Sequence, residues 1–475
     1  MKTLFFKTIA LIFMCSIQMA AFSQVMYQIS ASDANIKYTG RVDLSNPSSV
    51  KFGYSGVTIR AKFQGTAIDA VIKNGPYLNY PLPNTWDADY NDKTNYFYVI
   101  IDGAIQPTRL KLTPDSPAKT YQLARGLTDG VHTIELFKLT ETSCGIVEFQ
   151  GFQLETGKTL LPPDPLPTRV MEFIGNSITC GYGNEGTTYD PFHAEKENGY
   201  KAFGAMVARH FTAQYSCIAA SGRGLYMNGW GTTALTVPLI YDHTVADYPT
   251  PAWNRTRYTP DVIVIGLGTN DFAADNDGFW TFNATLFNDT YISFITKLRG
   301  YYPNATIICS GSSMLSDWYP EGKNTWTRHK QCLTTVVNNF KNKGDNKVHY
   351  FEVATDLGPN YGEGFHPSLA QHEKIANSLI AFINGLSYEV WSNQTQLETT
   401  ASNKSQLIAT SESLSISSEN QISKVELIDT QGAIISAQKV GDKSVTIPII
   451  ALPKGVYMAR ITYTDGSSET VKFIK

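Results

Sequence analysis

Hydrophobic and polar positions follow a period of two in the first third of the chain. From about residue 25 to 160, short runs rich in Val, Ile, Tyr and Phe are broken by turn residues, as in VTIRAKF (57–63), NYFYVIIDG (95–103) and HTIELFKL (132–139). Such alternation predicts half-buried antiparallel strands, and a series of them predicts a β-sandwich. The exposed face of this sandwich could bind carbohydrate or support the next domain, and the lack of an evident aromatic platform favours support.

The period changes beyond residue 168. Continuous apolar runs now alternate with amphipathic stretches of helical period, such as YKAFGAMVARHF and SLAQHEKIANSLIAFING. The strand-like runs are RVMEFI (169–174), QYSCIAA (214–220), DVIVIGL (261–267), ATIICSG (305–311) and VHYFEV (348–353). This pattern predicts an α/β fold with three α/β/α layers, in which helices cover both faces of a parallel sheet. Ligands of such folds bind beyond the carboxyl ends of the strands, so catalytic residues should follow strands.

Composition marks the boundaries between these zones. Four prolines fall between Pro162 and Pro167, where helix and sheet are both discouraged, and this indicates a stiff junction. After about residue 386 the chain becomes rich in Ser, Thr, Asn and Gln before short strands return, which predicts a linker and a small β-domain. The predicted organisation is a signal peptide (1–23), an N-terminal β-sandwich (24–160), a proline-rich junction (161–168), an α/β domain (169–386), a linker (387–405) and a C-terminal β-domain (406–475).

The first residues have the pattern of an export signal. Lys2 and Lys7 lie before an apolar stretch that ends in Ala21, Phe22 and Ser23, with small residues at the two positions that a signal peptidase reads. The apolar core is shorter than the ~20 residues needed to span a bilayer, and no later run is long enough. We therefore expect a mature protein that is soluble outside the cytoplasm, without stable membrane insertion.

Charge and cysteine content narrow the choice of partner. Basic and acidic residues number 39 and 42, which leaves no broad basic surface for nucleic acid and indicates a neutral partner. Once the signal is removed, Cys309 with Cys332 is the favoured bridge in an oxidising compartment, although buried free thiols are commoner in a domain of this size. No C-x-x-C, H-E-x-x-H or complete calcium-loop pattern occurs, so we expect no catalytic metal.

Small polar residues follow the first three strands of the predicted sheet. Ser177 lies just past the first strand, Gly222 follows the second in AASGRG, and Asn270 follows the third in GLGTND. A tetrahedral oxyanion needs two or three pre-aimed donors, and the amides of Ser177 and Gly222 with the carboxamide of Asn270 could supply them. Each residue alone is more often a loop, turn or cap residue, so the prediction depends on their order. The neighbouring Asp271 is more typical of a helix cap or loop anchor than of a catalytic acid.

A histidine follows the last strand. His366 stands directly before Pro367 and Ser368, which have the pattern of a helix start. Its imidazole should project at the same sheet edge as Ser177, where it could act as the general base toward a serine nucleophile. His372 lies six residues further along the predicted helix and should face elsewhere.

Other side chains near the predicted edge are weaker candidates. Trp230, Trp318 and Tyr182 could stack on sugar rings, although core packing or a loop contact is commoner for each. His193 and His243 lie in loops without a partner signal, and we interpret them as structural.

The ordered motifs GNSIT, a glycine after the second strand, GTND and a late HPS together resemble the SGNH (GDSL-like) hydrolase superfamily. With a jelly-roll-like β-sandwich ahead of the α/β domain, the arrangement is similar to carbohydrate esterase family 2, over roughly residues 30 to 385. The resemblance implies removal of acetyl groups from plant polysaccharides such as xylan and glucomannan, with preference for 6-O positions. It also implies that Ser177 is the nucleophile, Gly222 and Asn270 are oxyanion donors, and His366 is the base.

One position departs from the superfamily pattern. Members commonly carry Asp three residues before the histidine, whereas this chain has Glu363 there. Either Glu363 orients the imidazole and completes a triad, or a backbone carbonyl does so in a Ser-His dyad, which the family also tolerates.

The last zone resembles the C-terminal sorting domain of type IX secretion. The resemblance is carried by a short β-domain with the phrase LPKGVYMARI (452–461) and the ending VKFIK. It implies contact with the secretion machinery, passage through the outer membrane and removal of the domain.

These observations lead to the hypothesis of a secreted or cell-surface serine esterase that acts on acetylated polysaccharide or oligosaccharide without a cofactor. An SGNH lipase or another acyl hydrolase is an alternative, disfavoured by the sandwich domain and by the lack of a long apolar lid-like segment. A surface protein that binds carbohydrate on an inactive hydrolase scaffold is the alternative from a different class.

Overall fold

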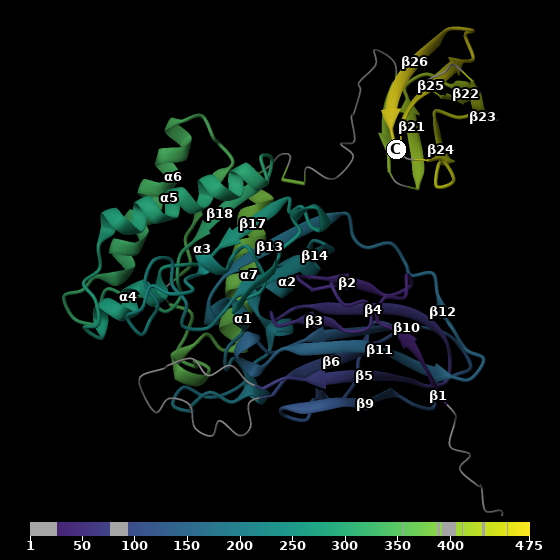
Figure 1. The fold of residues 1–475 in the computed structure, drawn as a ribbon. Coiled ribbons are helices and arrows are strands. Elements are labelled where there is room, and N and C mark those ends of the chain that lie inside the picture. Colours follow the sequence, from purple (N-terminus) through teal and green to yellow (C-terminus); the bar gives the residue numbers. More distant parts are fainter. Residues whose placement is uncertain are drawn as a thin grey trace, which may run out of the picture.

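The computed structural model describes residues 26–76, 94–354, 356–386, 390–391, 405–410, 412–429, 433–453 and 455–475. The predicted signal peptide and nearly all of the predicted linker lie outside the described residues. In Figure 1 the N-terminal strands form stacked layers at the lower right, next to the teal and green sheet and helices of the central part.

The N-terminal part consists of two antiparallel sheets, as the period-two pattern predicts. One sheet has the order β1 (Met26–Ser30), β11 (Val147–Glu155), β5 (Ile68–Asn74), β9 (Ser116–Ala124), with β3 (Val50–Phe52) also on β11. The other has the order β12 (Leu160–Leu161), β4 (Thr58–Gly65), β10 (Gly130–Lys138), β6 (Tyr96–Ile101), β7 (Ala104–Ile105), with β2 (Lys37–Thr39) on β4 and β8 (Leu110–Lys111) on β6. Their inward side chains, such as Phe63, Phe97 and Phe149, are fully buried and stabilise the sandwich by removing aromatic surface from water.

The sequence pattern predicts half-buried strands, but strand β6 is buried along its whole length. Its second face packs on the central part of the chain, where the Tyr98 ring lies 5.4 Å from the ring of Tyr200. Phe137 of the neighbouring strand β10 contacts the same tyrosine at 4.9 Å. The sandwich therefore shares an extensive apolar interface with the next domain.

The central sheet is parallel and contains all of the strands that the apolar runs predict. Its order is β14 (Ala213–Ala219), β13 (Arg169–Gly175), β17 (Val262–Ile265), β18 (Thr306–Ser310), β19 (Val348–Phe351). The chain leaves β13 for β14 on one side and returns to β17 on the other, so β13 lies at the point where the strand order reverses. In open α/β sheets, ligands bind outside the carboxyl ends of the strands at this point.

Helices cover both faces of this sheet. On one face, Phe173 of β13 packs with Phe203 and Leu379, from α2 (Phe203–His210) and α7 (Leu369–Gly385). On the other face, Ile174 shares a core with residues of α3 (Val237–Ile240), α5 (Ala284–Tyr301) and α6 (Thr325–Asn342). The short helices α1 (Ser177–Cys180) and α4 (Thr269–Asn276) follow β13 and β17, and a hairpin of β15 (His243–Val245) and β16 (Tyr248–Ala252) lies apart from the sheet. The predicted three-layer α/β/α fold is thus confirmed.

The C-terminal part is a small domain with two antiparallel sheets. They contain β20 (Ser405–Ala409), β21 (Ser413–Ser418) and β24 (Ser444–Pro448), and β23 (Ile434–Lys439), β22 (Ile422–Ile428), β25 (Val456–Tyr463) and β26 (Ser468–Ile474). Leu414, Ile447 and Ile461 belong to a core of its own, as expected of a separate domain.

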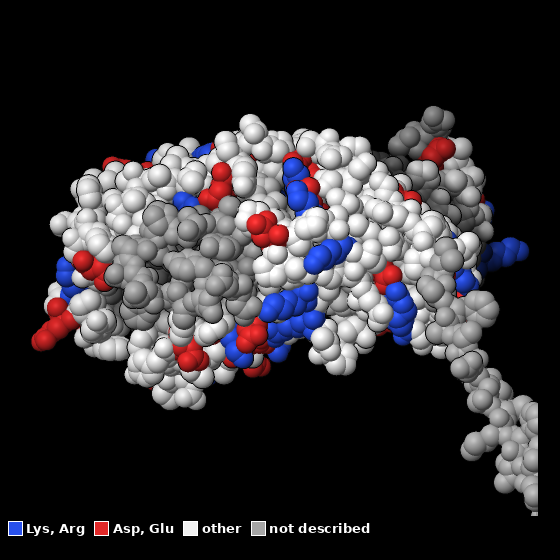
Figure 2. All heavy atoms as spheres, turned by 60° about the horizontal axis from the view of Figure 1, so that its bottom comes forward, with Lys and Arg blue, Asp and Glu red and all other residues white. Residues whose placement is uncertain are grey.

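The distribution of charged side chains agrees with the nearly equal numbers of basic and acidic residues. On the face shown in Figure 2, basic and acidic side chains are interspersed among mostly uncharged ones. The five cysteines of the described residues are buried and free, so the favoured bridge between Cys309 and Cys332 is not formed. Within the described ranges, no helix is long and apolar enough to cross a bilayer.

A buried ion pair crosses from the sandwich to the central sheet. Arg41 and Glu172 of β13 have no exposed side-chain surface, and the guanidinium nitrogen lies 3.6 Å from the carboxylate. Tyr241 donates its hydroxyl hydrogen to the same carboxylate at 2.5 Å, and Arg41 donates to the His243 carbonyl at 3.0 Å. Sequence patterns missed this contact because Glu172 lies inside a strand whose other residues are mostly apolar.

Replacing Arg41 by Met should lower the free energy of unfolding by about 3–5 kcal/mol, because Glu172 would keep a buried charge without its partner. Urea unfolding followed by tryptophan fluorescence measures the loss. The control is Arg60→Met, which breaks the pair of Arg60 with Glu135, whose side chains are 36% and 23% exposed. That change should cost under about 1 kcal/mol. Equal losses of unfolding free energy in the two variants would contradict the prediction that the buried pair contributes more to stability than the exposed pair.

Candidate active site

Ser177 is presented by a tight turn at the carboxyl end of β13. Asn176 caps the short helix α1, and its side chain accepts a hydrogen bond from the Ile178 amide at 3.2 Å. Gly181 ends α1 with φ of +86°, a conformation that favours glycine. The turn holds Ser177 with only 7% of its surface exposed, so its hydroxyl has a defined position.

His366 reaches the Ser177 hydroxyl. Its Nε2 lies 2.8 Å from Ser177 Oγ, although the two residues are 189 positions apart. Its Nδ1 lies 3.0 Å from the backbone carbonyl oxygen of Glu363, to which it donates, which leaves Nε2 free to accept the serine proton. The histidine follows the 3₁₀ turn Glu363–Phe365, in which Gly364 and Phe365 both have positive φ. This strained turn places the carbonyl oxygen of Glu363 within hydrogen-bonding distance of the imidazole.

Burial keeps the imidazole neutral. Removal of the ring from water lowers the pKa of His366 to about 4, against the opposing effect of the hydrogen bond to the Glu363 carbonyl. The ring lies against that of Tyr182 in a tilted arrangement with centroids 4.2 Å apart, and Tyr182 stacks in turn on Phe192 at 4.4 Å. A neutral imidazole near pH 7 is the form that a general base requires.

The carboxylate of Glu363 has a different partner. It accepts the His193 amide at 2.9 Å and lies 2.8 Å from His193 Nδ1. Gly183 and Gly186 leave the space that this fully buried side chain occupies, because a Cβ at either glycine would meet its atoms. Of the two arrangements that the sequence left open, the geometry therefore has a backbone carbonyl on His366, while the Glu363 side chain holds the loop that carries His193. The interpretation of His193 as a structural residue fits this contact with Glu363.

The predicted oxyanion donors lie at adjacent strand ends. Ala219 of β14 pairs with Gly175 of β13, so the residues that follow these strands are neighbours. Gly222 has φ of +73°, and Asn270 donates from its Nδ2 to the Arg223 carbonyl at 2.7 Å, which ties it to the same loop. Among the described residues, the amides of Ser177 and Gly222 have no acceptor. Ser221 and residues 223–227 all have one, so within this described loop segment Gly222 is the residue whose amide is unpaired.

Asp271 anchors this loop from below. Its buried carboxylate accepts the amides of Leu225, Tyr226 and Met227 at distances of 2.9 to 3.0 Å. Burial raises the pKa of Asp271 to about 6, and the three amide hydrogen bonds oppose the rise. The carboxylate is therefore a loop anchor, as its sequence position suggested.

The predicted aromatic residues are placed differently. Tyr182 covers His366, Trp230 packs on Gly222, where a Cβ would lie 2.1 Å from its ring, and Trp318 is 78% exposed. Sequence reasoning missed Tyr189 and Phe365, which are 87% and 46% exposed and pack edge to face at 5.5 Å. The position of Phe365 directly before His366 was the available signal.

Two other histidines, His372 and His243, make hydrogen bonds to the backbone, as expected of structural residues. His372 accepts the Phe203 amide at 3.2 Å, and His243 Nδ1 lies 2.7 Å from the Ala246 carbonyl oxygen. Within the part of the chain that the structure describes, no group of three or more His, Cys, Asp or Glu side chains could hold a metal ion.

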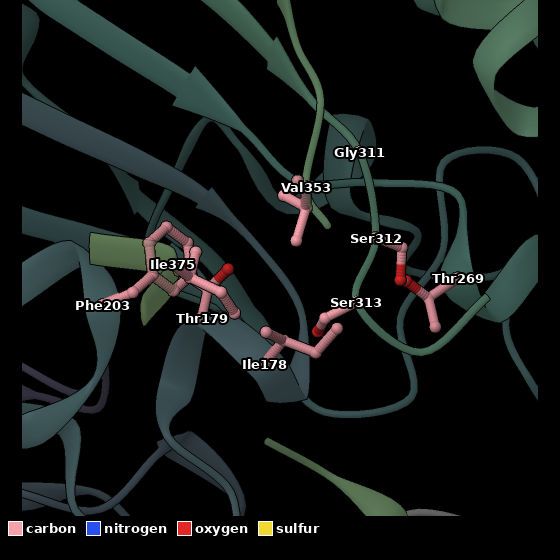
Figure 3. Close-up of a pocket in the computed structure, with 10 residues that line it drawn as sticks. Ile178, Thr179, Phe203, Thr269, Gly311, Ser312, Ser313, Val353 and Ile375 are labelled. Atoms are coloured by element: carbon pink, nitrogen blue, oxygen red, sulfur yellow. The ribbon is translucent and has the colours of Figure 1, made fainter. Parts of the chain in front are cut away.

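A small cavity lies beside the turn that carries Ser177 (Figure 3). Ile178 and Thr179 of α1 line it from one side and the loop with Ser312 and Ser313 from the other. Its free volume is about 20 Å³, room for roughly one water molecule. Neither Ser177 nor His366 lines this cavity.

Family comparisons cover all three parts of the chain. Residues 38–164 match the carbohydrate esterase 2 N-terminal family, residues 173–374 the GDSL-like lipase/acylhydrolase family, and residues 410–475 the secretion system C-terminal sorting domain. The last match points to export by type IX secretion.

Curated relatives and solved structures extend the match. The cellulase/esterase CelE of Acetivibrio thermocellus is 36% identical over 350 residues, which are 73% of this chain and only 39% of CelE. An acetylxylan esterase/glucomannan deacetylase of Cellvibrio japonicus is 30% identical over 62% of this chain and 79% of its own length. A family two carbohydrate esterase from Clostridium thermocellum, solved in complex with cellohexaose, is 35% identical with a TM-score of 0.64, over 74% of this chain and 98% of that one. Because the last two are matched over most of their own lengths, the chain belongs to carbohydrate esterase family 2 and is a carboxylic ester hydrolase.

Proposed function

We propose that this esterase removes acetyl groups from plant polysaccharides or oligosaccharides, such as acetylxylan and acetylglucomannan, at 6-O positions. The 2.8 Å contact between Ser177 Oγ and His366 Nε2 is the observation that carries the proposal. Relatives named acetylxylan esterase/glucomannan deacetylase support the substrate class.

In the proposed mechanism, His366 takes the hydroxyl proton as Ser177 Oγ attacks the acetyl carbonyl carbon. The amides of Ser177 and Gly222 and the second hydrogen of Asn270 Nδ2 stabilise the oxyanion. The imidazolium then gives its proton to the sugar oxygen, which leaves as an alcohol. Water, deprotonated by the same imidazole, attacks the acyl carbon. The imidazolium then gives that proton to Ser177 Oγ as its bond to the acyl carbon breaks, and the acetyl group is released as acetate. The Glu363 carbonyl stabilises the imidazolium through Nδ1 in both halves of the reaction.

Exposed aromatic rings are the proposed sugar-binding surface. Tyr189 and Phe365 lie on the His366 side, and Trp318 with Tyr319 forms a second exposed pair with centroids 6.2 Å apart. Aromatic faces bind the apolar faces of sugar rings while the hydroxyl groups stay in water. Trp230, which supports Gly222, and Tyr182, which supports His366, act on substrate through those residues rather than as open platforms.

We also propose that the chain reaches the cell surface or the medium. The match to a sorting domain over residues 410–475 supports export, and the predicted signal peptide would direct the first step.

Replacing Ser177 by Ala should abolish turnover of a chromogenic acetyl ester, with a fall in kcat of at least ~10³-fold, because the nucleophile is lost. Acetate release from acetylated xylan and glucomannan should fall in parallel, and NMR of the products maps the position deacetylated. The wild type should prefer acetyl to octanoyl esters. A wild-type protein that binds glycan but hydrolyses neither substrate would favour the inactive-scaffold alternative, and a preference for long acyl chains would favour a lipase.

The pH dependence should report the buried imidazole. Because the base must be neutral and the pKa of His366 is lowered to about 4, kcat/KM should stay level from pH 8 to about 5 and fall as pH drops toward 4. Tyr182→Ala, which uncovers the ring, should move the acidic midpoint upward toward the usual value of about 6.5. If the acidic fall in kcat/KM of the wild type had its midpoint near pH 6 and was absent from Asp271→Asn, the fall would be due to protonation of Asp271 and not of His366.

Changing Glu363 to Gln should reduce kcat less than about 10-fold, because Gln keeps an oxygen acceptor for His193 and leaves the carbonyl on His366 in place. Loss of a carboxylate that orients a catalytic histidine costs about 10⁴-fold in other serine hydrolases. Steady-state kinetics on the acetyl ester distinguish the two arrangements. A loss near the larger figure, with unchanged thermal stability, would show that the carboxylate acts on the imidazole.

A further inference from the structure

A carboxylate from the N-terminal β-domain reaches the predicted oxyanion loop. Glu141, which follows β10, is 1% exposed, and its Oε2 accepts the Ser221 amide at 2.7 Å. The same oxygen lies 3.8 Å from the Cys180 sulfur, which donates to it. Ser221 directly precedes Gly222, and Cys180 is the last residue of the helix that begins with Ser177. One oxygen atom therefore touches both segments that supply the unpaired amides.

The position of Glu141 is itself held by buried groups. Its amide donates to Glu197 Oε2 at 2.9 Å, and Lys138 Nζ donates to the Glu141 and Thr140 carbonyls at 3.1 and 2.6 Å. Lys138 and Glu197 have no exposed surface. Burial lowers the pKa of Lys138 to about 8 and raises the pKa of Glu197. Both the backbone and the side chain of Glu141 are thus fixed before any substrate binds.

We propose that Glu141 is a positioning residue for the oxyanion hole, so that the β-domain forms part of the catalytic apparatus. This inference rests on the proposed function. Gly222 has a positive φ and no side chain, and a free glycine would sample many backbone conformations. The Ser221 amide, just before Gly222, is restrained by the 2.7 Å hydrogen bond that it donates to Glu141 Oε2. The Arg223 amide, just after Gly222, is restrained by the 3.3 Å hydrogen bond that it donates to the Ala220 carbonyl. Between these two restraints the Gly222 amide stays aimed at the oxyanion.

The role of Glu141 differs from that of a residue that only stabilises the fold. Asp271 already holds residues 225–227 of the loop, so the far part of the loop does not need Glu141. What Glu141 adds is restraint at the end that carries Gly222. Loss of this restraint should therefore weaken binding of the transition state more than binding of the substrate.

The test compares three variants of the full chain. Glu141→Met keeps the length of the side chain and removes the acceptor, Glu141→Gln keeps an oxygen acceptor, and Arg41→Met breaks an equally buried contact across the same interface without touching the loop. We expect Glu141→Met to lower kcat on an acetyl ester by 10- to 100-fold with KM within two-fold. Glu141→Gln should stay within about three-fold of wild type, a rescue by its retained acceptor. Arg41→Met, assayed below its unfolding temperature, should keep the wild-type kcat.

A kcat of Glu141→Met within two-fold of wild type, or equal kcat losses in Glu141→Met and Arg41→Met, would overturn the inference. If Glu141→Met does not fold, Glu141→Asp replaces it, because the shorter side chain keeps the charge and withdraws the oxygen. It should lose at least 10-fold in kcat. Hydrogen exchange of the Ser221 amide gives a readout that does not need turnover. If the wild type is inactive, the proposed function fails, while faster exchange at Ser221 in Glu141→Met would still support the restraint and unchanged exchange would refute it.

Discussion

The hydrogen bond between Ser177 Oγ and His366 Nε2 is the contact on which the rest of the site depends. It joins segments 189 residues apart, so each partner must be held by its own local structure. Gly181 closes the turn behind the serine, and the turn Glu363–Phe365 folds its first carbonyl onto Nδ1 of the histidine. Tyr182 covers the imidazole and helps to keep it dry and neutral. A serine hydroxyl is a weak nucleophile, and a neutral base in contact with it is what makes attack feasible.

Three buried carboxylates hold the loops of this site, and none of them is hydrogen-bonded to the imidazole of His366. Glu363 accepts from His193, Asp271 accepts three loop amides, and Glu141 accepts the Ser221 amide. Each carboxylate is buried, and each satisfies backbone donors that would otherwise be costly to remove from water. These carboxyl groups therefore stabilise the shape of the loops, and catalysis would depend on preorganised amides more than on a carboxylate as a third catalytic residue.

The N-terminal sandwich contributes to this order. Its strand β6 is buried on both faces, Arg41 pairs with Glu172 of the central sheet, and Glu141 reaches the loop beside Gly222. Such an interface leaves little freedom for one domain to move on the other. The sequence favours a sandwich that supports the α/β domain, because it has no evident aromatic platform for carbohydrate, and these contacts fit that role. Through Glu141 the contacts reach the loop that carries Gly222.

Periodicity alone determined the sandwich, the five parallel strands and the rule that Ser177, Gly222, Asn270 and His366 follow strand ends, because burial of a sheet imposes a pattern that local sequence must satisfy. Only the tertiary structure decided which atom holds His366 Nδ1, and that His193 pairs with Glu363 across 170 residues. The direction of a side chain in a turn with two positive φ values depends on the space around it, here left by Gly183 and Gly186. That space is made by packing between distant segments, which no local pattern of hydrophobic and polar residues encodes.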